Sequence, residues 1–236
     1  MKRSIISKTL LVLLILIIPL ILYLLNFKLI LFDTNLHSAE FENQGVYEKF
    51  ENADEIDGKL LDYFKDQKPG LVDIDIYDGE EKQHLLDVKK AVNAGFSLLN
   101  FSLIIFLVLF AVFLWLNKDS MTKPVINVLI GGGLLTVCFA LLDLLFSVLN
   151  FELYFDVFHR MLFEGGTWLF SEGSNLIAMY PIGLFYDLAR QLLSNIIIHG
   201  FILVLIGFFV RVLSLNHKIV KKEKYLNKAL KRISRK

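Results

Sequence analysis

The chain has 236 residues, of which 55% are hydrophobic and 13% aromatic, and its formal net charge is +1. This apolar share exceeds that of ordinary soluble domains, so the composition indicates a membrane protein. The single cysteine, Cys138, excludes an internal disulfide framework and a metal site built from several cysteines.

The first hydrophobic run covers residues 9–31 and is long enough to cross about 30 Å of hydrocarbon. Basic residues precede it. Its apolar core is longer than that of a secretory signal, and no small-residue cleavage site follows it. Residues 1–31 are therefore predicted to form a cytoplasmic N-terminus and an uncleaved first transmembrane helix.

Residues 32–90 form a polar segment that is rich in acidic side chains. Within it, residues 70–77 (GLVDIDIY) alternate apolar and polar side chains, which predicts a β-strand. Residues 80–90 (EEKQHLLDVKK) have a helical pattern that leads directly into the next hydrophobic run. We therefore expect a small α+β cap outside the membrane, in which His37 is an ordinary loop residue.

Residues 91–150 hold two further hydrophobic runs, 91–116 and 125–150, which are predicted to be the second and third transmembrane helices. The short connection between them, residues 117–124, carries two lysines. Three consecutive glycines, residues 131–133, lie in the third run and favour close packing of helices. A phosphate-binding loop is not indicated, because no strand precedes the glycines and no Lys-Ser/Thr pair follows them.

The segment 151–190 is too polar to span a membrane and more aromatic than an ordinary solvated loop. It is expected to lie on the membrane surface or over the helix ends. A fourth span is predicted at 191–213 and a basic tail at 214–236. The predicted fold class is membrane α-helical, with four transmembrane helices and a small outward-facing α+β cap.

The distribution of basic residues predicts how the chain is oriented. They gather in the N-terminus, in the 117–124 connection and in the tail, and the positive-inside rule places these parts in the cytoplasm. The segments 32–90 and 151–190 then face outward together. The sequence thus predicts a multi-pass protein of the plasma membrane with both termini cytoplasmic, and no nucleic acid is expected as a partner.

Two histidines are candidates for proton transfer, because imidazole titrates near neutral pH. His84 lies just before the second span and His159 just after the third, so both are expected at the same face of the membrane. Asp87 and Asp156 each lie three residues from one of these histidines, where a carboxylate on the same helical face can orient the ring. A lone interfacial histidine is more often a polar tip on an apolar body, so the hypothesis depends on the pair.

Two other classes of protein stay open on the residues alone. One is a non-catalytic membrane protein whose outer cap binds lipid or a partner protein. The other is a metal-dependent membrane hydrolase, although the chain has no HExxH motif, no His-x-His pair and no G-x-S-x-G context. The sequence therefore gives no reason to expect a metal or a cofactor. The aromatic side chains of 151–190 fit an interfacial belt and equally a lining for acyl chains that arrive from the outer leaflet.

Two short stretches match a known pattern. One is His84-x-x-Asp87-Val88-Lys89, which precedes the second span. The other, after the third span, contains Phe158-His159, Phe163, Trp168-x-Phe170, Leu176-Ile177-x-x-Tyr180-Pro181 and Phe185-x-Asp187. Together with the layout of four spans and a long first outer segment, they resemble the lipoprotein intramolecular transacylase (Lit) family.

The resemblance implies an acyltransferase with four transmembrane helices and an outward cap. Such an enzyme moves the sn-2 acyl chain of a diacylglyceryl lipoprotein onto the α-amine of its N-terminal cysteine and so produces a lyso-form lipoprotein. The resemblance also implies that His84 and His159 carry the reaction without a metal or cofactor. One histidine would act as general base and the other as proton donor, and the sequence leaves open which is which. The residues expected to line the site or anchor the substrate are Asp87, Phe158, Arg160, Phe163, Trp168 and Tyr180.

Overall fold

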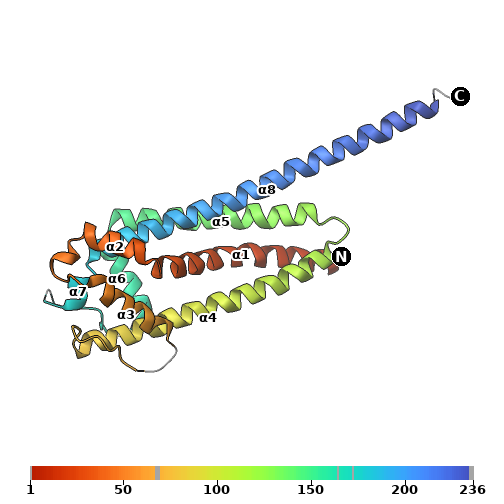
Figure 1. Ribbon diagram of the computed structural model, residues 1–236. Helices are drawn as coiled ribbons and strands as arrows, with labels where there is room; N and C mark the ends of the chain where they lie inside the picture. The colour runs from red at the N-terminus through yellow and green to blue at the C-terminus, as the bar shows by residue number, and fades with distance from the viewer. Residues whose placement is uncertain (1, 67–69, 164, 172, 234–236) are drawn as a thin grey trace.

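The computed structural model describes residues 2–66, 70–163, 165–171 and 173–233. Its helices, in chain order, are α1 (Lys2–Leu31), α2 (Thr34–Asn43), the 3-10 turn η1 (Val46–Glu48), α3 (Ala53–Lys65), α4 (Gly79–Leu116), α5 (Thr122–Leu149), α6 (Phe151–Leu162), α7 (Asn175–Met179) and α8 (Ile182–Ile233). Figure 1 shows α1, α4, α5 and α8 running alongside one another, with the short helices gathered at the end of the bundle away from the N-terminus.

Among the described residues, four helices are long and apolar enough to cross a membrane: the candidate spans are Ser4–Leu31, Gly79–Leu116, Thr122–Leu149 and Ile182–Asn216. They contain or match the hydrophobic runs predicted from the sequence. The chain is thus a multi-pass membrane protein. In α4, about three polar turns precede the apolar run that begins at Ala91, so this first part of the helix belongs to the cap.

The last helix differs in length from the prediction. α8 is one continuous helix of 52 residues that begins at Ile182, inside the segment expected to be interfacial, and continues through the basic tail. Its C-terminal part extends past the other helices of the bundle (Figure 1).

The predicted close packing at the glycine triplet is confirmed. A Cβ atom built on Gly133 of α5 would lie 2.6 Å from the carbonyl oxygen of Gly200 in α8 and 2.8 Å from Cγ2 of Val204. The absence of a side chain at Gly133 therefore lets the two helix backbones approach, which is how small residues stabilise helix pairs in membranes.

A Gly133→Val substitution is therefore expected to destabilise the bundle by about 1–3 kcal/mol, the usual cost of overpacking. Thermal unfolding in detergent measures the change. Gly58→Ala is the matched control, because a Cβ at Gly58 meets nothing within 4 Å and helix propensity favours alanine by roughly 0.5–1 kcal/mol. An unchanged melting temperature for Gly133→Val would contradict the close contact.

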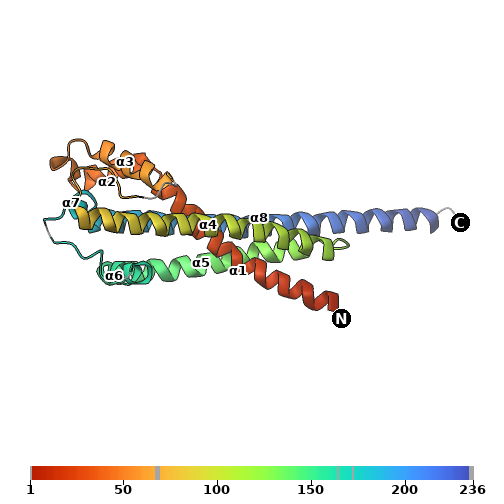
Figure 2. The same ribbon diagram turned by 90° about the horizontal axis from the view of Figure 1, so that it is seen from below.

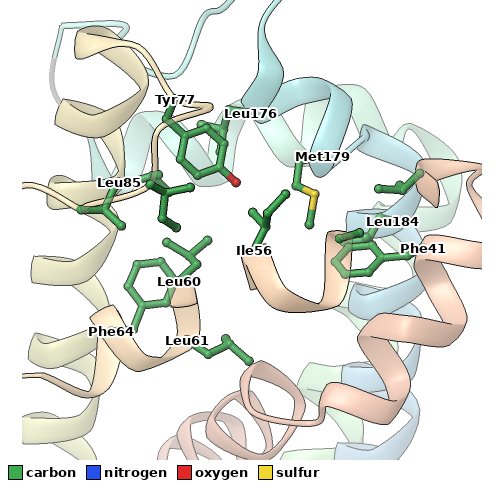
Figure 3. Close-up of a cluster of buried hydrophobic side chains, with 14 of the residues drawn as sticks. Phe41, Ile56, Leu60, Leu61, Phe64, Tyr77, Leu85, Leu176, Met179 and Leu184 are labelled. Carbon is green, nitrogen blue, oxygen red and sulfur yellow. The ribbon is translucent and has the colours of Figure 1, made fainter. Parts of the chain in front are cut away.

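The cap is a helical unit with its own hydrophobic core, drawn in Figure 3. α3 contributes an apolar stripe at helical spacing: Ala53, Ile56, Leu60, Leu61 and Phe64 are all buried. The stripe packs against Phe41 of α2, Met179 of α7, Leu184 of α8 and Leu85 of α4. The cap core thus joins residues from the two segments 32–90 and 151–190.

The predicted β-strand at residues 70–77 is wrong, because the described part of the chain contains no strand. The alternation is nevertheless real: Val72 and Ile74 are buried in the cap core, whereas Leu71 is half exposed. The segment lies along the core with one side inward and has no neighbouring strand to pair with. The alternation therefore identified the buried side chains correctly, but it did not indicate strand pairing. The described part of the cap is α-helical.

Candidate active site

The turn between α5 and α6 brings His159 to the cap end of the bundle. Asn150 ends α5, and its side-chain oxygen accepts a hydrogen bond of 3.0 Å from the Leu153 N–H group, which starts α6. In Figure 2, α6 leaves the end of α5 on the side away from α2 and α3. His159 lies in the last turn of α6.

His84 and His159 are side by side. Their ring centroids are 6.3 Å apart and their planes differ by 26°. Both side chains are buried, with exposed fractions of 6% and 9%. The structure thus brings together the two histidines that the sequence singled out, one from the first turns of α4 and one from α6.

Aromatic rings surround this pair. Phe163 and Phe170 present their edges to His84 at centroid distances of 5.0 and 5.5 Å. Phe155 lies 4.0 Å from the His159 ring. Phe158 and Trp168 lie 5.6 and 6.0 Å from it. The pair therefore lies in an apolar enclosure of the kind that excludes water.

One hydrogen bond fixes the tautomer of His159. Its Nδ1 lies 2.8 Å from the backbone carbonyl oxygen of Phe155. A carbonyl oxygen can only accept, so Nδ1 carries the proton. In the neutral ring, Nε2 then has a free lone pair and can accept a proton.

Burial keeps both histidines neutral. It lowers the pKa of His159, and it outweighs the opposing effects of the Phe155 carbonyl and of Asp156. It also lowers the pKa of His84 to about 4, with a further contribution from the neighbouring His159. The Nδ1 atom of His84 is buried and has no hydrogen-bond partner among the described residues. A buried ring nitrogen without a partner is costly and calls for an explanation.

The charged residues predicted near the histidines make other contacts. Asp87 forms an ion pair of 2.8 Å with Lys90, and Asp156 forms one of 2.9 Å with Arg160. Neither carboxylate is hydrogen-bonded to a histidine in the described structure. The Arg160 side chain is 68% exposed, so it lies at the rim of the site and not within it.

Tyr180 belongs to a separate buried network in the cap. Its hydroxyl donates a hydrogen bond of 2.9 Å to Asp57. The same carboxylate accepts from Nδ1 of His37 at 2.9 Å, and Nε2 of His37 lies 3.2 Å from the carbonyl oxygen of Ile30. The Ile30 carbonyl can only accept, so Nε2 of His37 carries a proton. With Asp57 as the carboxylate, Nδ1 donates as well and His37 is the charged imidazolium.

The pKa of His37 is shifted in the direction that favours this charged form. Burial alone would lower it, but the hydrogen bond and negative charge of Asp57, together with the Ile30 carbonyl, raise the pKa above its usual value. The prediction that His37 is an ordinary loop residue is therefore wrong. It is a buried cation in α2, paired with Asp57 of α3.

Phe155 and Glu81 lie near the site, and the sequence singled out neither of them. Glu81 is the buried acid of the two. It lies one turn before His84 on α4 and is 2% exposed. One carboxylate oxygen accepts from the Asp78 N–H group at 2.9 Å. The other accepts from the Ser174 hydroxyl at 2.5 Å and from the Leu176 N–H group at 3.0 Å. A capping box at Asp78 and Glu81 was the sequence signal that could have revealed it.

An apolar surface lies beside the histidines. Exposed side chains of α6 and the following segment include Leu153, Val157, Phe158, Met161, Leu162 and Leu169. Contact of such a surface with water is unfavourable, whereas contact with lipid acyl chains is favourable. No group of three or more His, Cys, Asp or Glu side chains in the described residues is arranged to hold a metal ion.

Comparisons with known proteins agree on one family. The model of lipoprotein intramolecular transacylase Lit matches residues 6–186. No curated protein matches the chain. A solved structure of the membrane-integral lipoprotein intramolecular transacylase Lit from Bacillus cereus has a TM-score of 0.73 at 19% identity, covering 94% of this chain and 99% of its own.

Two further structures of the Bacillus cereus protein, with a histidine replaced by arginine and by alanine, also have TM-scores of 0.73. Both are 17% identical to this chain and cover 94% of it. At this level of identity the likeness shows a common fold.

Proposed function

The chain belongs to the lipoprotein intramolecular transacylase family, a family of membrane acyltransferases, and we propose that it moves the sn-2 acyl chain of a diacylglyceryl lipoprotein to the α-amine of the N-terminal cysteine. The observation that carries this proposal is the pair of buried histidines at 6.3 Å, enclosed by aromatic rings beside an exposed apolar surface.

His159 acts as the general base in this proposal. The cysteine α-amine attacks the carbonyl carbon of the sn-2 ester, and a C–N bond forms. The proton that the nitrogen must lose passes to Nε2 of His159, because Nδ1–H is already donated to Phe155. The lowered pKa keeps the ring neutral, and therefore basic, at neutral pH.

The same proton completes the transfer. Collapse of the tetrahedral intermediate breaks the bond between the carbonyl carbon and the glyceryl oxygen. His159 returns its proton to that oxygen, which leaves as an alcohol. The products are an amide and a free sn-2 hydroxyl, His159 is neutral again, and the mass of the lipoprotein is unchanged.

His84 acts as the hydrogen-bond donor to the oxygen that becomes negatively charged. A pKa of about 4 keeps it neutral with one N–H group. Its Nδ1 atom has no described protein partner, so a partner that arrives with the substrate would satisfy it. Donors aimed at developing charge in a dry site are a large source of catalysis, with about 3–4 kcal/mol for a single donor.

The apolar enclosure assists by positioning and by lowering polarity. Ester and amine belong to one molecule, so an enclosure that folds the lipid back on itself supplies proximity without a second substrate. Apolar surroundings also favour the neutral amine that attacks. The exposed apolar side chains of α6 offer the acyl chains a lateral entry from the outer leaflet.

This proposal requires the cap to face outward. Basic residues at both chain ends and in the 117–124 connection place the opposite end of the bundle in the cytoplasm by the positive-inside rule. The cap, with His84 and His159, then meets the outer leaflet.

Mass spectrometry of a model lipoprotein tests the proposal. A lipopeptide that carries deuterium only in its sn-2 chain is incubated with the purified protein. We expect the label in an N-acyl fragment, at unchanged total mass. Label that stays in the glyceryl ester, or an N-acyl group drawn from the unlabelled sn-1 chain, would contradict the proposed reaction.

A further inference from the structure

A second polar site lies at the end of the bundle away from the histidines. A cavity of about 620 Å³ lies where α1 begins, α4 ends and α5 begins. Figure 1 shows these three ends together near the N-terminus. None of its lining residues takes part in the proposed reaction or belongs to the cap.

The charged side chains that line the cavity are all positive. Lys8 of α1 and Lys123 of α5 both line it, and no acidic residue is among its described lining residues. Neither lysine forms an ion pair with a described residue. Two cations from different helices therefore converge on one space whose described lining residues carry no negative charge.

Neutral hydrogen-bonding groups complete the polar side. Asn117 donates from Nδ2 to the Ser7 hydroxyl at 2.9 Å and to the Phe113 carbonyl oxygen at 2.7 Å, which ties α1 to the end of α4. Asn127 of α5 lines the same cavity. The Phe113 side chain, 1% exposed, belongs to its apolar wall.

The depth of the site matches a lipid headgroup. The span Ser4–Leu31 has 28 residues and so extends over about 42 Å. The hydrocarbon core is only about 30 Å thick. The first residues of α1, including Ser7 and Lys8, therefore reach the headgroup layer of the leaflet on that side.

We propose that this cavity binds the phosphate-bearing headgroup of an anionic phospholipid from the leaflet at this end of the bundle. Lys8 and Lys123 contact the phosphate, the Asn127 amide contacts a further headgroup oxygen, and the apolar wall contacts the first carbons of the acyl chains. Each of these two lysines, in contact with the headgroup, is expected to strengthen binding to anionic lipid by about fivefold.

Native mass spectrometry of the purified full-length protein, titrated with phosphatidylglycerol or phosphatidylcholine, tests the site. The wild type is expected to retain phosphatidylglycerol preferentially, and the Lys8→Gln/Lys123→Gln variant is expected to bind it about 25-fold more weakly. Lys118→Gln is the matched control, because Lys118 lies in the same connection but does not line the cavity, and it keeps wild-type binding.

Three results would overturn the proposal. One is equal retention of phosphatidylglycerol by the double variant and the wild type. Another is equal binding of the two lipids by the wild type. The last is full thermal stabilisation of the protein by inorganic phosphate alone, which would identify a site for the free ion and not for a lipid.

The buried carboxylate of Glu81 supports a second inference. It connects α4 to the Ser174 hydroxyl and the Leu176 N–H group. The segment before Ser174 holds Phe170, whose edge lies against His84. We infer that Glu81 is a positioning residue, which holds this segment over His84 in the proposed reaction.

Hydrogen exchange and kinetics together test this role. In Glu81→Gln, one amide oxygen replaces two carboxylate oxygens and cannot serve both the Asp78 and the Leu176 N–H groups. We expect faster exchange at residues 173–179 and a kcat at least tenfold lower at unchanged KM. Glu80→Gln is the matched control, because Glu80 is the neighbouring residue and is exposed. It is expected to keep the wild-type exchange rates and the wild-type kcat.

Loosened exchange with wild-type kcat would overturn the positioning role, and so would a lower kcat without loosened exchange. The inference rests on the proposed function for its kinetic part only. A wild-type protein without transacylase activity would defeat that function, whereas the exchange data would still report whether Glu81 holds the segment.

Discussion

The His159→Ala variant is expected to transfer acyl chains about 10²- to 10⁴-fold more slowly than the wild type, the usual contribution of a positioned general base. The reason is the single lone pair at Nε2, left free because Nδ1–H is donated to the Phe155 carbonyl. Conversion of the lipopeptide measures the rate, and thermal unfolding checks that the variant is folded. A fully active variant would remove His159 from the mechanism.

Chemical rescue separates a role in catalysis from a role in packing. Alanine at position 159 leaves a space of about the size of an imidazole ring. Added imidazole is expected to restore part of the rate, whereas pyrrole, which lacks a basic nitrogen, is expected to restore none. Rescue by both compounds would indicate that the ring only fills space among Phe155, Phe158 and Phe163.

The second large effect is expected from Asp57→Ala, which should destabilise the cap by about 3–5 kcal/mol, the usual cost of leaving one charge of a buried pair alone. The side chains of His37 and Asp57 are only 8% and 4% exposed, and Tyr180 also loses its acceptor. Asp62→Ala on the same helix is the control, because the Asp62 pair with Lys65 is exposed and such pairs contribute about 0–1 kcal/mol. Similar melting temperatures for the two variants would contradict the buried pair.

The stability of this pair has a defined dependence on pH. The folded-state pKa of His37 is raised above its usual 6.5. Its contribution is therefore complete below pH 6.5 and is lost as the pH rises through the folded-state value. The difference in melting temperature between wild type and His37→Gln should shrink from pH 6 towards alkaline pH. A difference that grows over this range would mean that His37 is neutral in the fold.

Hydrophobic runs predicted the bundle well, because a span needs only length and apolar composition. The helix before the second span was also predicted, since its pattern continues into that span without a break. The same local logic placed His84 and His159 at one membrane face. Their contact at 6.3 Å depends on the turn at Asn150 and on α6, which no local pattern specifies.

The cap was predicted less well, because its partners are distant in sequence. The alternation in residues 70–77 reported burial against α3 and not pairing with a strand. His37 looked ordinary because Asp57 and Tyr180 reach it only through tertiary folding. Tyr180 was expected near the substrate for its place in the family pattern, and the structure places its hydroxyl in this cap network.

A crossover experiment tests the central claim, intramolecular transfer at the two histidines, most directly. Two lipopeptides, one with deuterated acyl chains and one with a heavier peptide, are mixed with the purified protein. The account predicts N-acylated products of the two parental masses only, formed about 10²- to 10⁴-fold more slowly with His159→Ala. Products that combine the deuterated chain with the heavier peptide would show intermolecular transfer and would contradict the account.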